Sequence, residues 1–244
     1  MSFELMGINI EEWTFDNLHH FISKSVDMDK AIEVLNVNIH AMNLIYDNSE
    51  LFEILKSAEC VFCDGEGVRV AANYLGANIP YKITYADWMQ KFLPYCADRG
   101  YRIFFVGSTP QILEKAVDTV QTTWPNINLS GALNGFENYS TIKKAIERAN
   151  PQIILFGMGM PLQEQTIRQL KMDGVTGVYL SGGAVFDYLS KEVRRAPEWM
   201  VVFKLEWLFR FLLEPKRLFT RYFIGNPLFF WRIVTKQRPR FLKN

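Results

Sequence analysis

Short, mostly uncharged apolar runs alternate with longer amphipathic stretches along most of the chain. The apolar runs have the length and composition of strands that are buried on both faces of a parallel sheet. The longer stretches repeat their apolar residues every three or four positions, as helices with one buried face do. This pattern predicts strands over residues 3–10, 31–38, 58–62, 102–106, 127–131, 152–156 and 175–180, and helices over residues 15–26, 41–57, 68–75, 85–99, 110–124, 141–149 and 164–171.

Strands and helices that alternate in this way indicate an α/β fold with a mostly parallel, Rossmann-like sheet and right-handed crossovers. Asp16 is expected to cap the first helix, and Pro110 suits the first turn of the helix that it opens. Further helices are predicted over residues 199–213 and from Pro215 onward. We therefore divide the chain into an α/β core, residues 1–194, and a C-terminal helical appendage, residues 195–244.

The formal net charge of +1 conceals an uneven distribution. Residues 1–190 carry 14 Lys and Arg against 22 Asp and Glu, a net of −8, whereas residues 191–244 carry 13 against 4, a net of +9. The basic tail is also aromatic, a combination typical of helices at a membrane surface, so an anionic membrane is one expected partner. The alternative is a helical hairpin that packs on the core with its arginines in solvent. No nucleic-acid partner is expected, because no recognised binding motif accompanies the tail.

Several predicted strands end in loops of small residues, and the loop over residues 63–68 is the most distinctive. In open α/β sheets, ligands bind at the carboxyl ends of the strands, where backbone N–H groups and helix dipoles favour phosphates. Asp64 lies in this loop, and its charge would repel a phosphate. Asp64 is therefore either a base that faces the reacting end of a substrate or simply the N-cap of the next helix.

Common nucleotide and zinc motifs are missing from the sequence. The glycine pairs at residues 65–67 and 157–159 do not extend to a G-x-G-x-x-G fingerprint, and there is no P-loop, which disfavours a dehydrogenase or an NTPase. Cys60 and Cys63 have the spacing of half a zinc site, but no second pair follows.

No secretory leader or membrane-spanning stretch is predicted. The N-terminus lacks a basic leader followed by an apolar run, and no uncharged apolar stretch approaches the roughly 20 residues that span a bilayer. The three cysteines, Cys60, Cys63 and Cys96, are too few for a disulfide framework. We therefore expect a cytoplasmic protein with reduced thiols.

A series of short motifs runs along the chain in a fixed order. They are Asn36-Val37-Asn38, Cys63-Asp64-Gly65-Glu66-Gly67-Val68, Phe105-Val106-Gly107-Ser108, Gly157-Met158-Gly159-Met160-Pro161-Leu162-Gln163-Glu164, Gly182-Gly183-Ala184-Val185-Phe186-Asp187, Arg194-Arg195-Ala196-Pro197, Leu205-Glu206-Trp207-Leu208-Phe209-Arg210 and Glu214-Pro215-Lys216-Arg217-Leu218. Through them the chain, from about Gly7 to Phe230, resembles the WecG/TagA/CpsF glycosyltransferases (glycosyltransferase family 26).

The resemblance implies an inverting glycosyltransferase of the hexosyltransferase class (EC 2.4.1). Such an enzyme moves a hexose derivative, of ManNAc, ManNAcA, GlcA or Glc/Gal type, from a UDP-sugar donor to a polyprenyl-diphosphate-linked saccharide acceptor. The products feed bacterial cell-surface polysaccharides. The expected location is the inner face of the cytoplasmic membrane, with peripheral attachment. No metal cofactor is expected, and a homo-oligomer is left open.

The family's motifs also imply roles for individual residues. Asp64 would be the general base, and Arg210, Arg217 and Arg221 would bind phosphate groups of the donor or acceptor. Substrate binding is implied for Asn36, Asn38, Gln163, Glu164, Asp187, Gly157, Gly159, Gly182 and Gly183. Three of these have alternatives: Asn38 and Gln163 could cap loops, and Asp187 could cap a helix that begins near Val185.

The sequence departs from the family's pattern around the implied sugar site. Asn36 stands where threonine is frequent, Leu162 replaces a lysine, Glu66 replaces an apolar residue, and Lys82 only roughly replaces an arginine. These departures bear on the identity of the donor sugar more than on the reaction. The D-x-D string at residues 27–29, a metal-binding pattern in many glycosyltransferases, is interpreted as a solvated turn. A Rossmann-type oxidoreductase and a non-catalytic membrane-surface module remain as alternatives.

Overall fold

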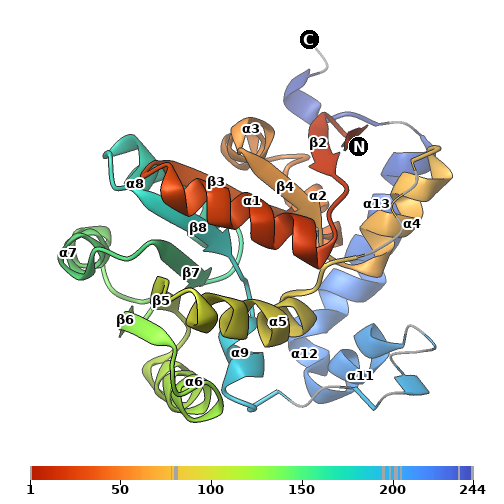
Figure 1. The fold of residues 1–244 in the computed structure, drawn as a ribbon. Helices are drawn as coiled ribbons and strands as arrows, with labels where there is room; N and C mark the ends of the chain where they lie inside the picture. Colours follow the sequence, from red (N-terminus) through yellow and green to blue (C-terminus); the bar gives the residue numbers. More distant parts are fainter. Residues whose placement is uncertain are drawn as a thin grey trace.

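The computed structural model describes residues 2–77, 79, 82–193, 196–197, 199–200, 203, 205–235 and 237–242. In these residues one 8-stranded sheet has the order β1-β2-β4-β3-β8-β7-β5-β6 (Figure 1). The strand pairs from β2 to β6 are parallel, and β1 pairs antiparallel with β2. The predicted α/β fold with a mostly parallel sheet is therefore confirmed.

Most strands lie where the apolar runs predict them, but the first prediction is wrong. Residues 3–10 do not form one strand, because Met6 and Gly7 take positive φ values of 53° and 90° and turn the chain into a hairpin. The strands are β1 (Ser2–Leu5), β2 (Ile8–Glu11), β3 (Ala31–Val37), β4 (Cys60–Cys63), β5 (Arg102–Gly107), β6 (Asn128–Leu133), β7 (Ile153–Gly157) and β8 (Gly177–Ser181).

Two helix predictions are also corrected, whereas Pro110 does open its helix. Thr14, not Asp16, caps α1, because its side chain accepts a hydrogen bond from the Asn17 amide at 3.2 Å. The single helix predicted over residues 41–57 is two helices, and Asn48 caps the second. The core helices are α1 (Phe15–Asp27), α2 (Ile39–Leu44), α3 (Ser49–Ser57), α4 (Glu66–Tyr74), α5 (Tyr85–Asp98), α6 (Pro110–Thr123), α7 (Tyr139–Ala149), α8 (Leu162–Met172) and α9 (Val185–Leu189).

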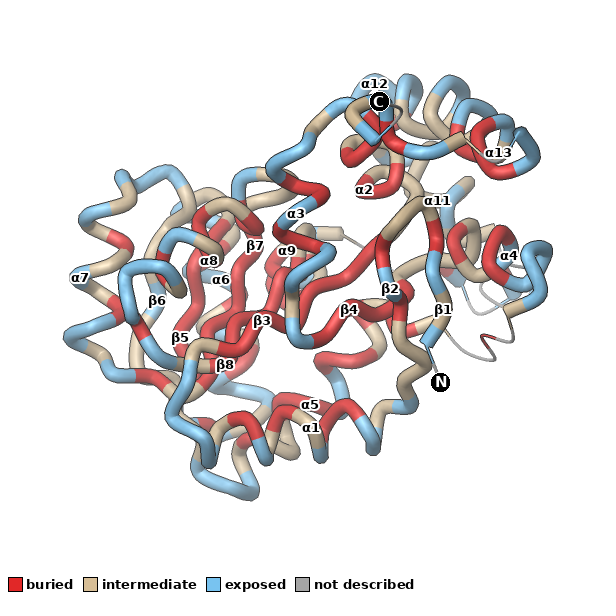
Figure 2. Tube along the Cα trace, turned by 90° about the horizontal axis from the view of Figure 1, so that it is seen from above, coloured by how far each residue is buried: buried red, intermediate tan, exposed pale blue. Residues whose placement is uncertain are grey.

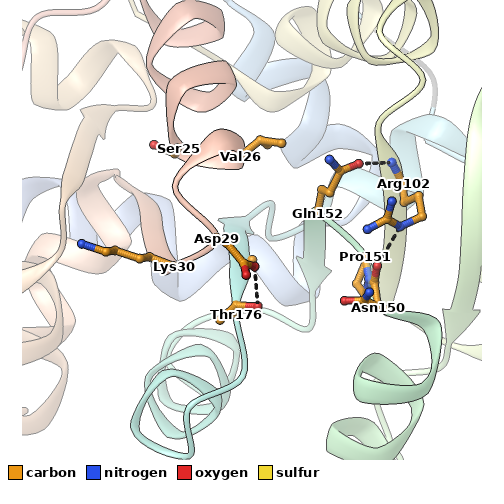
Figure 3. Close-up of a pocket in the computed structure, with 10 residues that line it drawn as sticks. Ser25, Val26, Asp29, Lys30, Arg102, Asn150, Pro151, Gln152 and Thr176 are labelled. Carbon is orange, nitrogen blue, oxygen red and sulfur yellow. Dashed lines mark hydrogen bonds between the residues drawn. The ribbon is translucent and has the colours of Figure 1, made fainter.

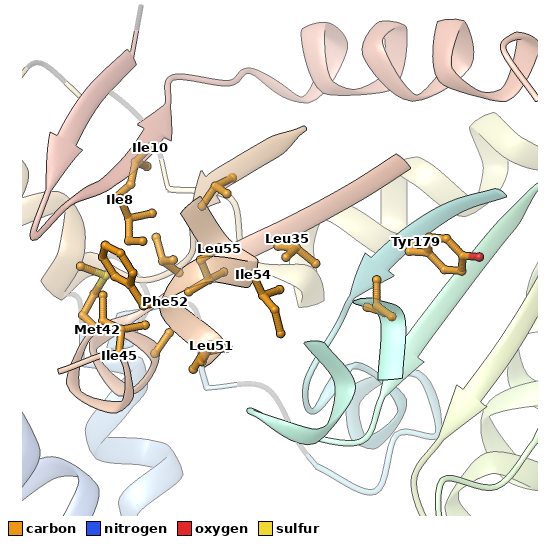
Figure 4. Packing of buried hydrophobic residues seen from close by; sticks show 14 of the residues in the cluster. Ile8, Ile10, Leu35, Met42, Ile45, Leu51, Phe52, Ile54, Leu55 and Tyr179 are labelled. Atoms are coloured by element: carbon orange, nitrogen blue, oxygen red, sulfur yellow. The ribbon is translucent and has the colours of Figure 1, made fainter. Parts of the chain in front are cut away.

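Helices cover both faces of the sheet, and Figure 2 shows the buried strands between them. Neighbouring residues of a strand point to opposite faces, so Leu35 and Val37 join one apolar cluster while Ile32 and Val34 join the other. The first cluster lies against α2, α3, α4 and α8 (Figure 4), and the second lies against α1, α5, α6 and α9. Burial on both faces explains why the strands are almost uniformly apolar.

The C-terminal segment is helical, as predicted, but its bounds differ. Its helices are α11 (Glu206–Leu213), α12 (Pro215–Phe219), the π-helical η1 (Thr220–Gly225), α13 (Asn226–Val234) and the 3-10 helix η2 (Arg240–Leu242). The predicted helix over residues 199–213 is wrong in extent, because Leu205 lies before the first turn of α11 as its N-cap.

The last helix of this segment is part of the core. Phe229 and Ile233 of α13 are buried in the same cluster as Leu5 and Ile8 of the N-terminal hairpin. The predicted boundary between residues 194 and 195, and with it Arg194 and Arg195, lies outside the described residues. Within the residues that the structure does describe, no helix combines the length and the apolar character that crossing a bilayer requires.

Candidate active site

The loops that the sequence singles out lie together at one edge of the sheet. β4, β3, β8 and β7 are consecutive neighbours and run parallel, so their carboxyl ends meet at this edge. Asp64 follows β4, Asn38 follows β3, and the glycine loops beginning at Gly182 and Met158 follow β8 and β7. The strand order therefore brings these loops together at the carboxyl ends of the strands, where ligands bind in open α/β sheets.

Asp64 is not a helix cap. The N-cap of α4 is Gly65, which has a φ of 105° and makes no side-chain capping bond. Instead the Asp64 carboxylate accepts a 2.8 Å hydrogen bond from the side-chain amide of Asn36, and its backbone N–H donates to the Val37 carbonyl at 2.9 Å. A positive φ at Gly65 lets the chain turn sharply into α4, which leaves the carboxylate at the strand end.

Asn36 is itself held by the neighbouring strand. It is only 3% exposed, and its side-chain oxygen accepts from the Ser181 hydroxyl at 3.2 Å. The same hydroxyl lies 3.3 Å from the Asn36 backbone N–H. Ser181 of β8 therefore fixes the orientation of the amide that meets Asp64. The sequence analysis does not single out Ser181, because no local motif signals this role.

Burial raises the pKa of Asp64 to about 6. The positive charges of Arg221 and Lys82 and the Asn36 hydrogen bond oppose that rise, and the negative charge of Glu206 adds to it. Arg221 lies on η1 and Glu206 on α11, so the C-terminal segment faces the carboxylate. Lys82 lies 3.7 Å from Glu206 and is therefore a cation of this site. In the sequence, Lys82 stands out only as a rough replacement for an arginine of the family.

Gln163 joins the two glycine loops. Its side-chain oxygen accepts from the backbone N–H groups of Gly159, at 3.2 Å, and Gly183, at 3.1 Å. Its amide nitrogen donates to Glu164 at 2.7 Å. The Gly182 N–H is also used, because it donates to the Phe156 carbonyl. These N–H groups are therefore engaged within the protein, and Gln163 fixes the shape of the loops; their contact with substrate stays a prediction.

Other predicted binding residues also have structural partners. Asn38 caps α2 by accepting from the Ala41 N–H at 3.1 Å, as the capping alternative predicts. Gly157 lies where a side chain would collide with Phe186, because a Cβ there would be 2.4 Å from the ring. Glu164 is fully buried, and burial raises its pKa to about 7.

A second acidic group, Asp187, lies on α9 and interacts electrostatically with two of the predicted arginines, Arg210 of α11 and Arg217 of α12. It does not cap this helix, whose N-cap is Ala184. Burial raises the pKa of Asp187, while Arg217 and Arg210 oppose the rise.

The two arginines near Asp187 differ in their partners. Arg210 lies 5.2 Å from the centre of the Tyr188 ring and 3.9 Å from Glu214, and its buried Nε and Nη2 donate no hydrogen bond to any described residue. Arg217 pairs with Glu214 at 2.6 Å. Arg221 interacts electrostatically with both arginines, so the three predicted cations belong to one region.

The opposite edge of the sheet holds a small cavity of about 40 Å³ (Figure 3). Polar contacts line it: Gln152 accepts from the Arg102 backbone N–H at 3.0 Å, and Thr176 donates to Asp29 at 3.2 Å. The space suits one or a few waters, not a sugar nucleotide. Asp29 belongs to the D-x-D string, which therefore lies before β3, at the edge away from Asp64.

Within the described part of the chain, no three His, Cys, Asp or Glu side chains are grouped so that they could hold a metal ion. Cys60, Cys63 and Cys96 are all buried and free.

Comparisons with known proteins match this chain almost end to end. A family model described as the glycosyl transferase WecG/TagA/CpsF family matches residues 3–243. The chain is also similar to the N-acetylglucosaminyldiphosphoundecaprenol N-acetyl-beta-D-mannosaminyltransferase of Bacillus subtilis (strain 168). The two are 29% identical over 199 residues, which cover 81% of this chain and 76% of the relative. The family match includes both the Asp64 loop and the C-terminal arginines.

Proposed function

The chain belongs to the WecG/TagA/CpsF glycosyltransferase family, and on that premise we propose that it is an inverting, UDP-sugar-dependent hexosyltransferase. Its acceptor is a polyprenyl-diphosphate-linked saccharide. The name of the relative suggests transfer of N-acetylmannosamine to undecaprenyl-diphosphate-linked N-acetylglucosamine, which we take as the first substrate pair to test. The β configuration in that name is what inversion of an α-linked donor produces.

The environment of Asp64 is the observation that carries this proposal. A single-displacement reaction needs a base that is ionised at neutral pH yet strong enough to take a proton from a hydroxyl group. A pKa of about 6 meets both conditions, because most of the carboxyl is then ionised at pH 7. The Asn36 amide holds one oxygen in place. No described residue is shown to bond the other oxygen, which we assign to the acceptor hydroxyl.

In the proposed reaction, Asp64 removes the proton of the acceptor hydroxyl as its oxygen attacks the anomeric carbon of the donor. The new glycosidic bond forms on the face opposite the departing group, and the bond from that carbon to the UDP oxygen breaks. UDP leaves with the electron pair of that bond. A general base of this kind contributes roughly a hundredfold to ten-thousandfold in rate.

The negative charge on UDP must be stabilised as it leaves, and we assign that role to Arg210, Arg217 and Arg221. Preorganised cations of this kind stabilise a phosphate leaving group without moving during the reaction. Arg210 fits best, because two of its nitrogen atoms donate no hydrogen bond to the described residues. We expect the reaction to be independent of metal ions.

The basic C-terminal segment would bring the enzyme to its lipid-linked acceptor. Apolar side chains are exposed on consecutive elements of this segment, among them Phe223 of η1 and Trp231 of α13, which are 51% and 62% exposed. Together with the net charge of +9 over residues 191–244, they suit a peripheral contact with an anionic membrane at its cytoplasmic face.

The proposal is tested by measuring UDP release from a panel of UDP-sugars in the presence of polyprenyl-diphosphate-sugar acceptor analogues. We expect acceptor-dependent release that persists in EDTA and falls by at least a hundredfold in Asp64→Asn. Asp173→Asn, which removes an exposed carboxylate of α8's C-cap, is the matched control and should keep full activity. Undiminished release by Asp64→Asn would overturn the base mechanism, and acceptor-independent release would overturn the transferase proposal.

A further inference from the structure

One side chain connects the α/β core to two elements of the C-terminal segment. The side-chain amide of Asn43, on α2, donates a 2.7 Å hydrogen bond to the carbonyl oxygen of Gly225, the last residue of η1. Its side-chain oxygen accepts a 2.9 Å hydrogen bond from Arg232 of α13. Asn43 thus uses both ends of its amide on residues that lie far away in the sequence.

On the core side, α2 is fixed relative to Asp64. The helix begins directly after β3, where Asn38 caps it, and β3 also carries the Asn36 that bonds the Asp64 carboxylate. The Asp64 backbone N–H donates to Val37, the last residue of β3. Asn43 therefore extends a rigid connection from the catalytic loop toward the C-terminal segment.

On the other side, η1 lies near the surface, and its Tyr222 and Phe223 rings contact Trp207 and Phe211 of α11. None of its six residues, all of which the structure describes, is buried. By contrast, α13 is anchored independently, because Phe229 and Ile233 are in the core and Arg232 stacks 3.7 Å above the Tyr46 ring. The Asn43–Gly225 hydrogen bond is thus a polar contact that ties η1, an element with no fully buried residue, to the core.

The absence of a side chain at Gly225 permits this contact. Its φ of −65° is ordinary for a helix, so the backbone conformation does not require glycine. A Cβ at this position would instead lie 3.3 Å from the amide nitrogen of Asn43, which is tighter than most such contacts. Arg221 lies four residues earlier in the same short element, about one turn away.

We propose that Asn43 is a positioning residue that holds η1, and with it Arg221, beside Asp64. This inference rests on the proposed role of Asp64 as the base. Asn43 itself acts through Arg221 and does not touch the substrate. Loosening η1 withdraws a positive charge from the carboxylate, which should raise the pKa of Asp64.

The acidic limb of kcat/KM against pH measures that change. In the wild type we expect an apparent pKa near 6. Among the described residues, the titratable and charged groups that face Asp64 are Arg221, Lys82, Glu206, Cys63, Tyr85 and Tyr188, and those that face Arg221 are Tyr222, Arg210, Arg217 and His40. Among the described groups that face Asp64, Arg221 is the one that lies on η1, so a shift of the limb reports the placement of Arg221.

The main variant is Asn43→Asp, which keeps an acceptor for Arg232 but loses the donor to Gly225. We expect the acidic limb to move up by about half a pH unit to one unit, with kcat/KM reduced at pH 6. Gly225→Ala, which crowds the same contact from the other side, should move the limb in the same direction. Asn48→Asp is the matched control, because its capping role needs only an acceptor, and it should leave the limb unchanged.

A double-mutant cycle separates positioning from the direct effect of the added charge. In an Arg221→Gln background, Asn43→Asp should produce no further shift, because the charge that it positions is gone. If Asn43→Asp shifted the acidic limb equally in the wild-type and Arg221→Gln backgrounds, the inference would be overturned. It would also be overturned if the limb of both Asn43→Asp and Gly225→Ala stayed at its wild-type position. If Asp64→Asn kept its activity, the proposed base mechanism would fail instead, whatever Asn43→Asp did.

Discussion

Replacing the Asp64 carboxyl with an amide should make the protein more stable while it removes the proposed base. The pKa of Asp64 is raised from 3.8 to about 6 because folding takes the charged carboxylate out of water. A raised pKa in the folded state means that ionisation of this group opposes folding. Asp64→Asn keeps an oxygen that can accept the hydrogen bond from Asn36, and it removes the destabilising effect of the ionised carboxylate.

The magnitude and the sign follow from this pKa. A shift of about two units corresponds to about 3 kcal/mol at 1.36 kcal/mol per unit. Because Asp64 keeps partial contact with water, we expect about 1–2 kcal/mol, or a rise in Tm of about 2–8 °C at pH 8. The contribution of Asp64 to stability is present below about pH 4 and is lost as the pH rises to about 6. The advantage of the variant should therefore shrink to about half at pH 5.

The assay is thermal or urea unfolding of wild type and Asp64→Asn at pH 5 and pH 8. Asp173→Asn is an informative control, because hydrogen bonds from Tyr139 and Lys143 lower the pKa of Asp173. Its contribution to stability is present at high pH and lost as the pH falls, so its variant should be less stable at pH 8. An Asp64→Asn protein that is no more stable than wild type at pH 8, or whose advantage does not change with pH, would refute the reasoning.

Two further predictions concern packing and the membrane. Glu33 is fully buried and bonded by Arg168 at 2.8 Å through both oxygens, so Arg168→Ala should lower the free energy of unfolding by about 2–4 kcal/mol, measured by urea unfolding. Lys171 still reaches Glu33 at 3.1 Å, which limits the loss, and a change under 1 kcal/mol would contradict this account. Phe223→Glu and Trp231→Glu should weaken sedimentation with anionic liposomes tenfold or more, while Phe136→Glu, at a more exposed position after β6, should not. Equal loss in both cases would contradict a defined membrane face.

Much of the core fold could be predicted because strands that are buried on both faces consist almost entirely of apolar residues. The runs that became β5, β7 and β8 contain almost only apolar residues, and no tertiary contact is needed to interpret them. The failures are short turns. The sequence predicts one element over residues 3–10 and one over residues 41–57. Met6 takes a left-handed conformation that a methionine does not favour, so the turn there is not predicted. Asn48 caps the second of two helices, but asparagine is also found inside helices.

The site could be predicted only in part, for a related reason. Asp64 stands out because a carboxylate in a glycine loop is chemically unusual. Ser181, Asn43 and the loop-joining role of Gln163 could not be found in this way, because their contacts span 145, 182 and 20 positions of sequence. Their identities are common polar residues, so only the tertiary structure shows what they hold.

The C-terminal segment serves the fold and the site at once, which limits how its role can be tested. Its sequence reads as an appendage, with a basic charge and exposed aromatic residues. Yet Phe229 is fully buried beside Leu5 and Ile8, while Arg221 on the preceding element lowers the pKa of Asp64. Removing the segment would open the core as well as take charges from the site, so loss of activity in a truncated protein would not identify the cause. Substitutions that leave Phe229 in place, such as Asn43→Asp and Trp231→Glu, separate the position of the catalytic charges from membrane contact.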